Sequence, residues 1–256
     1  MLGAIIGDII GSVHEGVGTK TKDFPLFTPR SRFTDDTVLT VAVADVLLNG
    51  RDYAEVFHEY YHSYPRSGFG GGFIAWANSP PLEPYNSFGN GSAMRVSPVA
   101  YARDTLDDVL AEAKRSAEAT HNHPEGIKGA QAVAAAVFLA RTGSGKDAIR
   151  EHVTRAFGYD LDRDIDELRK TYTFDVTCQG SVPESIVAFL ASEDFEDAVR
   201  NAISLGGDAD TMACMAGAIA EPFYGGVPPA LAEEALARLP ERLREMVEAF
   251  RARFWS

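Results

Sequence analysis

Two short acidic segments contain the residue types that bind hard divalent cations. Thr34-Asp35-Asp36-Thr37 precedes an apolar run at 38–48, and Gly206-Gly207-Asp208-Ala209-Asp210-Thr211 precedes a second apolar run at 212–220. Carboxylate and hydroxyl oxygens are the ligands that Mg²⁺ and Mn²⁺ prefer in proteins. Each segment stands where a helix is expected to begin, because small and apolar residues follow it at helical spacing. If the fold brings the two segments together, they can share a pair of ions.

Each segment also has a simpler explanation. Asp and Thr are ordinary N-cap residues, so capping accounts for either segment taken by itself. The recurrence of the same residue types before a second helix favours a shared site, because Mg²⁺ and Mn²⁺ each take about six oxygen ligands, more than one segment supplies. We therefore predict that four carboxylates converge although they are far apart in the sequence: Asp35, Asp36, Asp208 and Asp210.

The N-terminal segment provides two further carboxylates. Residues 2–14 fit a buried helix, and three glycines spaced four residues apart leave one of its faces bare, so that another helix or a ligand can come close. Asp8 and Glu15 lie two turns apart, on roughly the same side. A hydrogen bond between packed helices would explain Asp8 equally well, and a solvent-exposed helix end would explain Glu15. Residues 16–33 are expected to form a loop long enough to cover a site.

A glycine-rich segment in the middle of the chain is suited to binding a phosphate. Ser87-Phe88-Gly89-Asn90-Gly91-Ser92-Ala93-Met94-Arg95 places glycines and small hydroxyls before an apolar helix expected at 93–101, where free backbone N–H groups can hold an anion. Arg95 is expected to bind an anion, to pair with an acidic segment or to lie at the surface. His121 and His123 allow zinc binding, but no Cys pair or His-Glu-x-x-His motif accompanies them, which favours a structural or ligand-contacting role.

The bulk composition excludes several classes of protein. The 256 residues include 24 Lys and Arg against 37 Asp and Glu, a net charge of −13, which argues against a general electrostatic surface for nucleic acid or an anionic membrane. No run of about 20 apolar residues is present to span a membrane. Cys178 and Cys214 form no spacing motif, and no signal peptide is recognisable, so we expect reduced thiols and a cytoplasmic protein.

The pattern of apolar residues predicts one all-α domain over residues 1–256. Strands in alternation and repeats of fixed period are both missing from the pattern. Besides the segments already described, helices are expected at 52–63, 70–76, 105–119, 124–141, 145–157, 162–170, 182–191, 194–204, 228–237 and 240–254.

Taken together, these motifs resemble the ADP-ribosylglycohydrolase family. The resemblance covers most of the chain and rests on five motifs in order: Gly3-Ala4-Ile5-Ile6-Gly7-Asp8 with Glu15, Phe33-Thr34-Asp35-Asp36-Thr37, Gly89-Asn90-Gly91-Ser92-Ala93-Met94-Arg95, Thr120-His121-x-His123, and Gly206-Gly207-Asp208-Ala209-Asp210-Thr211. It implies an orthogonal helical bundle with a metal-lined cleft that takes ADP-ribose. It also implies two Mg²⁺ or Mn²⁺ ions held by Thr34, Asp35, Asp36, Asp208, Asp210 and Thr211.

The resemblance implies roles for other residues as well. The substrate-binding candidates are Ser87, Phe88, Gly89, Asn90, Gly91, Ser92, Arg95 and His121. The catalytic candidates are Glu15, Asp35 and Asp36, one of which would position a water or take its proton. The loop at 16–30 is where family members differ, so the sequence does not predict which acceptor carries the ADP-ribose.

The leading hypothesis is therefore a metal-dependent hydrolase that releases ADP-ribose from a modified arginine or serine side chain, or from a small ADP-ribosyl adduct. Hydrolysis at ribose passes through an oxocarbenium-like state, which two cations can assist by orienting the ribose hydroxyls and activating a water. The alternatives are a non-catalytic ADP-ribose-binding or crystallin-like protein of the same fold, and a phosphatase or nuclease that uses two metals. The expected partner is ADP-ribose, an ADP-ribosylated protein or a small molecule, and we expect a monomer.

Overall fold

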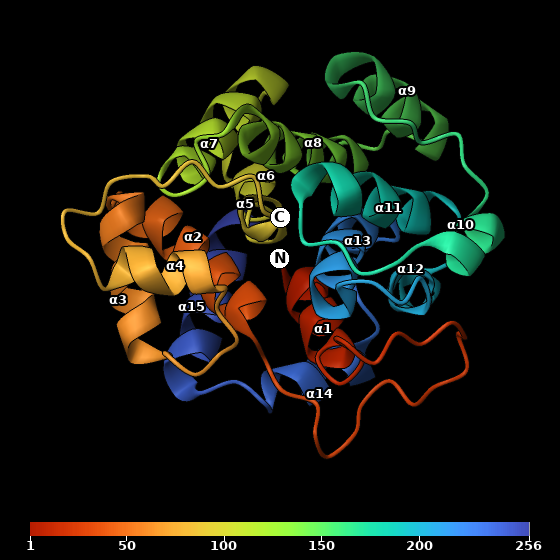
Figure 1. The fold of residues 1–256 in the computed structure, drawn as a ribbon, viewed down its shortest axis with the longest axis horizontal. Coiled ribbons are helices and arrows are strands. Elements are labelled where there is room, and N and C mark those ends of the chain that lie inside the picture. Colours follow the sequence, from red (N-terminus) through yellow and green to blue (C-terminus); the bar gives the residue numbers. More distant parts are fainter. Residues whose placement is uncertain (256) are drawn as a thin grey trace.

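The computed structural model describes residues 1–255, and within this range the protein is all-α (Figure 1). The helices are α1 (Leu2–Gly11), α2 (Asp35–Asn49), α3 (Tyr53–Ser63), α4 (Gly71–Ala77), α5 (Gly91–Met94), α6 (Val99–Ala102), α7 (Leu106–Glu118), α8 (Pro124–Arg141), α9 (Lys146–Phe157), α10 (Ile165–Thr171), α11 (Cys178–Leu190), α12 (Phe195–Ser204), α13 (Ala209–Phe223), α14 (Pro229–Leu236) and α15 (Glu241–Phe254). Extended pairing in this range is limited to an isolated bridge between Gly89 and Thr177.

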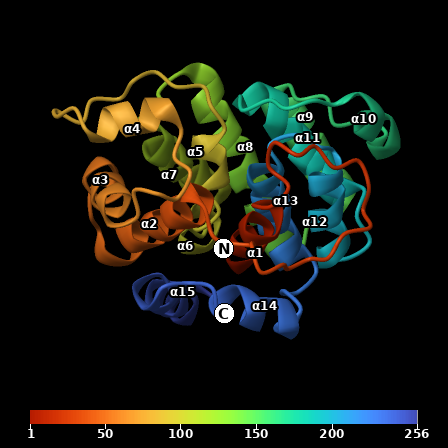
Figure 2. The same cartoon turned by 60° about the horizontal axis from the view of Figure 1, so that its bottom comes forward.

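Helices α1 and α13 form the centre of the molecule (Figures 1 and 2). The bare face of α1 packs on α13, because a Cβ atom on Gly7 would lie 2.1 Å from the carbonyl oxygen of Ala213. One turn further on, a Cβ atom on Gly11 would lie 2.4 Å from the Cα atom of Asp210. The predicted glycine face therefore receives another helix, and its close approach places the end of α1 beside the start of α13.

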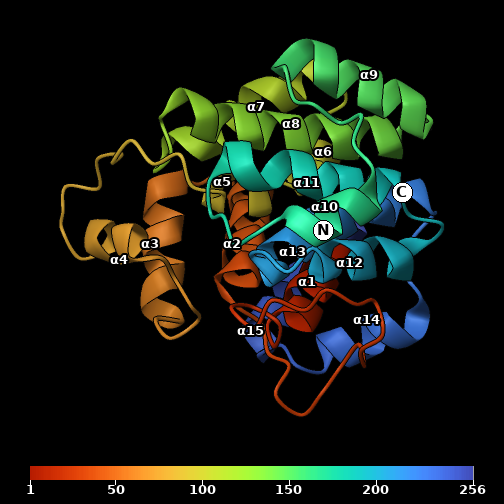
Figure 3. The ribbon, with the colours of Figure 1, turned by 45° about the vertical axis from the view of Figure 1, so that its right-hand side comes forward.

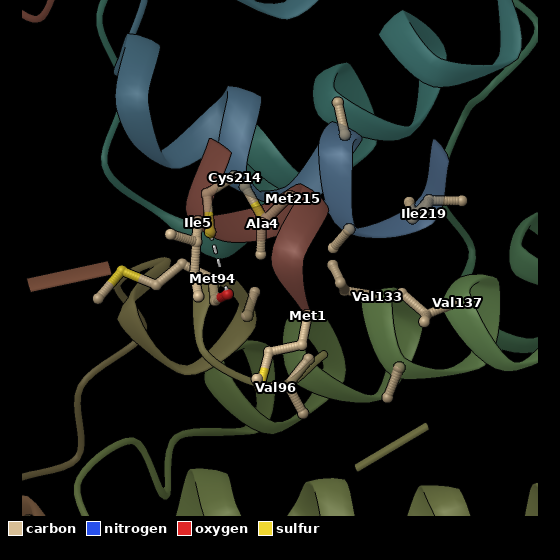
Figure 4. Close-up of a cluster of buried hydrophobic side chains, with 14 of the residues drawn as sticks. Met1, Ala4, Ile5, Met94, Val96, Val133, Val137, Cys214, Met215 and Ile219 are labelled. Carbon is tan, nitrogen blue, oxygen red and sulfur yellow. Dashed lines mark hydrogen bonds between the residues drawn. The ribbon is translucent and has the colours of Figure 1, made fainter. Parts of the chain in front are cut away.

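The hydrophobic core surrounds this central pair. Helices α11 and α12 pack on α13, α8 packs on α13 as well, and α2 packs on α1. Figure 4 shows one part of the core, in which Ile5 of α1, Val133 of α8 and Met215 of α13 belong to one buried cluster. In the same place, Cys214 Sγ donates to the carbonyl oxygen of Met94 at 3.3 Å, which links α13 to the end of α5.

Outer helices close the two sides of the molecule. Figure 3 shows α3 and α4 projecting beside α2, and Figure 2 shows α14 and α15 lying beneath α1 and α2. Arg242 of α15 pairs with Glu59 of α3 and donates to Ser63 Oγ at 3.1 Å. The helices run in several directions, so the acidic segments meet at a junction of helix starts rather than along a parallel bundle.

Four predicted helix boundaries are wrong, one of them at α10, which begins at Ile165 rather than residue 162. Helix α1 ends at Gly11 instead of residue 14, because residues 12–17 form turns. The helix expected at 93–101 is two short helices, α5 and α6, with Pro98 at the N-cap of the second, since proline provides no N–H group to continue the first. Helix α11 begins at Cys178 rather than residue 182, because the Thr177 side chain caps it by accepting from the Gly180 N–H.

Two predictions about bulk properties also bear on the fold. No helix within residues 1–255 has the length and apolar character needed to cross a membrane. Both cysteines are buried and carry free thiols. Burial raises the pKa of Cys178 to about 12, so this thiol stays protonated at neutral pH.

Candidate metal and substrate site

The two acidic segments meet at a cavity of about 290 Å³, which is lined by Thr34, Asp35 and Asp36 from the start of α2 and by Asp208, Asp210 and Thr211 from the start of α13. Thr211 Oγ1 donates to Asp36 Oδ2 at 3.3 Å and joins the segments directly. The four carboxylates predicted to converge from distant parts of the sequence therefore line one site.

Capping explains only part of this arrangement. Thr34 is the N-cap of α2, and its Oγ1 accepts from the Asp36 N–H at 3.3 Å, so the hydroxyl does the capping and the neighbouring carboxylates are not needed for it. Asp208 occupies the N-cap position of α13 without capping it. Its Oδ2 accepts instead from Asn90 Nδ2 at 2.7 Å, which ties the glycine-rich segment to the acidic cluster.

Asp8 lies beneath the cluster and organises it. This carboxylate is fully buried and accepts from the Thr34 N–H at 3.0 Å, from Thr34 Oγ1 at 2.7 Å and from the Thr37 N–H at 3.1 Å. A further short contact comes from Thr37 Oγ1. The helix-packing alternative for Asp8 is therefore correct, and the same bonds hold the start of α2 against α1. Asp8 was missing from the predicted ligands, although a lone carboxylate in an apolar helix was a signal for it.

The residues present fit two divalent cations. Carboxylate oxygens of Asp8, Asp36 and Asp210 lie within 4.8 Å of one another, and so do those of Glu15, Asp208 and Asp210, so the two groups share Asp210. Asp36 Oδ1 is buried without a hydrogen-bond partner. Within residues 1–255 no Lys or Arg forms an ion pair with any of these groups, which leaves the buried charge uncompensated. Asp35 lines the cavity but belongs to neither group.

Burial and mutual repulsion shift the pKa values of the cluster. Burial raises the pKa of Asp8 to about 6, while the bonds from Thr34 and Thr37 oppose the shift. Burial and then the charge of Asp8 raise the pKa of Asp35 to about 8. The pKa values of Asp36 and Asp210 are well above the usual range, first through burial and then through neighbouring carboxylates. A bound cation would relieve this cost by stabilising the ionised forms.

These shifts predict how stability depends on pH. A carboxyl group with a raised pKa holds its proton in the folded state, so ionising it destabilises the metal-free protein as pH rises from the ordinary carboxyl pKa of 3.8 to about 8. Bound cations remove this penalty. We therefore expect the Tm difference between Mn²⁺-loaded and chelator-treated protein to grow from pH 5 to pH 8. Calorimetry across this range measures it, and a difference that shrinks with pH would contradict this account of the cluster.

The glycine-rich segment is fixed at one side of the cavity by the chain before α11. The Asn90 N–H donates to the Val176 carbonyl at 2.8 Å, and the Cys178 N–H donates to the Phe88 carbonyl at 2.9 Å. Gly89 N donates to Ser87 Oγ at 3.2 Å, which tightens the turn. These bonds give the segment a defined shape before any ligand binds.

Most of the predicted substrate-binding residues face this cavity, whose lining includes Ser87, Gly89, Asn90, Gly91, Arg95 and His121. Phe88 and Ser92 lie outside the lining. The Phe88 side chain is 45% exposed and its ring centroid lies 5.2 Å from that of His123. Ser92 Oγ donates to the Gly126 carbonyl at 2.7 Å, so a ligand contact from Ser92 would have to use its backbone.

His121 and His123, considered as a possible pair in the sequence, have different partners in the structure. His123 is the N-cap of α8, and its Nδ1 accepts from the Glu125 N–H at 3.1 Å. His121 is buried at the cavity, where its Nδ1 bonds to Thr120 Oγ1 at 2.7 Å. The two side chains therefore serve different purposes, and the arrangement offers no shared zinc site.

Glu15 stands at the entrance of the cavity, just beyond the end of α1. It is exposed, and its carboxylate belongs to the group that contains Asp208 and Asp210. Partial burial and the charge of Asp208 raise the pKa of Glu15, while Arg32, which also lines the cavity, lowers it. A carboxylate with this environment can exchange protons with a group bound beside the acidic cluster.

Comparison with known proteins identifies the family of the chain. The family model described as ADP-ribosylglycohydrolase matches residues 1–255. The chain is 28% identical to ADP-ribosylhydrolase ARH3 of Mus musculus, covering 98% of this chain and 86% of that protein. It is 27% identical to the ADP-ribosylarginine hydrolase Tri1 of Pseudomonas putida (strain GB-1), covering 91% and 72%. A solved structure, an ADP-ribosylglycohydrolase-related protein complex, superposes with a TM-score of 0.73 at 26% identity over 97% of this chain and 95% of that one.

Proposed function

Because the chain belongs to the ADP-ribosylglycohydrolase family and is an ADP-ribosyl glycohydrolase, we propose that it cleaves, with two divalent cations, the bond between ADP-ribose and a modified side chain or small adduct. The observation that carries the metal dependence is the pair of carboxylate groups that share Asp210: their aspartates are buried, and none of them forms an ion pair with a Lys or Arg within residues 1–255. Their all-oxygen chemistry suits Mg²⁺ or Mn²⁺ better than zinc.

The protein's own residues divide the work within the cavity. Asp8, Asp36, Asp208 and Asp210, with Thr34, Thr211 and Asp35 beside them, would hold the ions. When bound, the ions supply positive charge that orients ribose hydroxyls and activates water. Glu15 is the candidate general acid or base, because it is the carboxylate at the entrance, where the acceptor must leave. Asn90 holds Asp208 in place through its amide.

The glycine-rich segment would hold the diphosphate through its backbone. Within residues 1–255, no lysine lines the cavity, so a basic clamp on the phosphates would have to come from Arg32 or Arg95 alone. The Gly91 and Ser92 N–H groups begin α5 and are free of intrahelical partners there. Backbone donors at such a position are suited to phosphate oxygens.

Replacing Gly91 with Val tests this assignment. A Cβ atom at Gly91 would lie 3.1 Å from His121 Nε2, so a branched side chain must displace either the histidine or the ligand. We expect ADP-ribose affinity to fall at least about tenfold, while Mn²⁺ affinity stays within about twofold, as isothermal titration calorimetry can measure. Gly145→Val is the control, because a Cβ atom there meets nothing within 4 Å. An equal loss of both affinities would indicate a folding defect.

Turnover of a substrate panel distinguishes the proposal from its alternatives. The purified protein with Mg²⁺ or Mn²⁺ is offered ADP-ribosyl-arginine, ADP-ribosyl-serine and O-acetyl-ADP-ribose, and free ADP-ribose is measured. We expect release from at least one of them. Tight ADP-ribose binding without any release would favour the non-catalytic, crystallin-like alternative. Phosphate release from a generic phosphoester, with no action on the panel, would favour a two-metal phosphatase.

A further inference from the structure

A buried hydrogen-bond chain runs from Arg95 through Thr120 to His121, and the residues at its two ends line the cavity beside the glycine-rich segment. Arg95 and Thr120 are fully buried, and His121 is 4% exposed. Arg95 Nη2 donates to Thr120 Oγ1 at 2.9 Å, and Thr120 Oγ1 lies 2.7 Å from His121 Nδ1. Arg95 follows α5, and Thr120 and His121 follow α7, and neither helix contributes a residue to the acidic cluster.

The direction of this chain follows from the chemistry of arginine. A guanidinium group can only donate, so Thr120 Oγ1 must accept from it. Both hydrogens of Arg95 Nη2 are used, because the same nitrogen also donates to the Ser116 carbonyl at 2.9 Å. The group is held in place by stacking, since its central carbon lies 4.2 Å from the ring centroid of Phe57.

The hydrogen between Thr120 Oγ1 and His121 Nδ1 can belong to either atom. If His121 Nδ1 carried a proton and donated it to Thr120, the buried threonine hydroxyl would accept twice and its own hydrogen would have no acceptor. An unsatisfied buried donor carries a substantial desolvation penalty. If Thr120 donates to His121 Nδ1, both the threonine hydroxyl and Nδ1 have partners, whereas Arg95 Nε and Nη1 are buried without one in either arrangement. We infer that Arg95 and Thr120 are positioning residues that hold His121 as the neutral tautomer with its proton on Nε2.

This tautomer determines what His121 offers to a ligand. Nε2 is directed at the glycine-rich segment, where a Cβ atom on Gly91 would lie 3.1 Å from it and one on Gly89 would lie 3.7 Å away. Burial, and then the charge of Arg95, hold the pKa of His121 well below its usual range, so the ring stays neutral at physiological pH. His121 is thus a donor to an acceptor oxygen, either phosphate or hydroxyl, and cannot take a proton at Nε2. This consequence for the ligand rests on the proposed function.

The side chain of Thr120 provides a conservative test. Thr120→Val keeps the shape and removes the hydroxyl, whereas Thr120→Ser keeps the hydroxyl and is the matched control. Nitrogen-15 NMR of the ligand-free protein reports which imidazole nitrogen of His121 is protonated, and the loss of one signal set in His121→Ala assigns it among the 6 histidines. Calorimetry with ADP-ribose and Mn²⁺ then measures binding.

We expect the wild-type protein and Thr120→Ser to show a protonated Nε2 and an unprotonated Nδ1. In Thr120→Val we expect the two tautomers to mix and ADP-ribose to bind about tenfold more weakly, while Mn²⁺ affinity is unchanged. A protonated Nδ1 in the wild-type spectrum would overturn the inference, and this spectrum is decisive even if Thr120→Val does not fold. A failure of the wild-type protein to bind ADP-ribose would count against the proposed function and leave the tautomer result standing.

Discussion

Asp210→Asn is expected to reduce kcat/KM for ADP-ribose release by roughly 10³-fold or more. Asp210 is the carboxylate that both groups share, so its replacement removes a ligand from each. The metal-free variant is expected to be at least as stable as the wild type, because the substitution removes a carboxyl group whose ionisation is unfavourable in this buried cluster. Thermal unfolding with and without Mn²⁺ should then show no stabilisation by the metal.

Asp147→Asn is the control for this substitution, because the Asp147 side chain is 98% exposed on α9, away from the cavity. It should leave both turnover and metal stabilisation unchanged. If Mn²⁺ stabilised Asp210→Asn against thermal unfolding as much as it stabilises the wild type, Asp210 would not be a metal ligand. Full wild-type turnover in excess chelator would remove the metal mechanism altogether.

Glu15→Gln is expected to lower kcat by about 10²- to 10⁴-fold while ADP-ribose and Mn²⁺ still bind. The amide preserves the size of the side chain but can neither take up nor release a proton. Because the raised pKa of Glu15 comes from partial burial and from Asp208, the wild-type pH–rate profile should contain a titration that the variant lacks. Steady-state kinetics between pH 5 and pH 9 measure both effects.

Glu151→Gln serves as the control, since its side chain is 75% exposed on α9. A decrease in Mn²⁺ affinity equal to the decrease in kcat would identify Glu15 as a ligand instead of an acid or base. Turnover within about threefold of the wild type would exclude it from proton transfer and leave Asp35 or Asp36 as candidates.

The sequence was informative where the residue type itself carries the chemistry. Paired carboxylates and threonines at helix starts predicted the acidic cluster, and the glycine face of α1 predicted a close approach. Which partner would use that face could not be predicted, because a helix and a ligand need the same bare surface. Pro98 could have indicated the break between α5 and α6, since proline is rarely tolerated inside a helix.

The sequence was uninformative where the direction and the partners of a side chain depend on tertiary contacts. Asp8 gains its role from donors on Thr34 and Thr37, a relation that helical periodicity cannot reveal. Ser92 turns towards α8, although a small hydroxyl in a glycine-rich turn suggested a phosphate contact. Two of the expectations for Arg95, a position at the surface and a pair with an acidic segment, are wrong. The residue is fully buried and forms no ion pair within residues 1–255.

Anomalous diffraction from crystals grown with Mn²⁺ locates the ions bound to this protein. We expect two Mn²⁺ peaks roughly 4 Å apart between the start of α2 and the start of α13, beside Asp210. The peaks should disappear from crystals of Asp210→Asn while the surrounding helices keep their positions. Crystals of active wild-type protein that show no peak at this junction, or show peaks only elsewhere on the surface, would contradict the claim that these two helix starts form the metal centre.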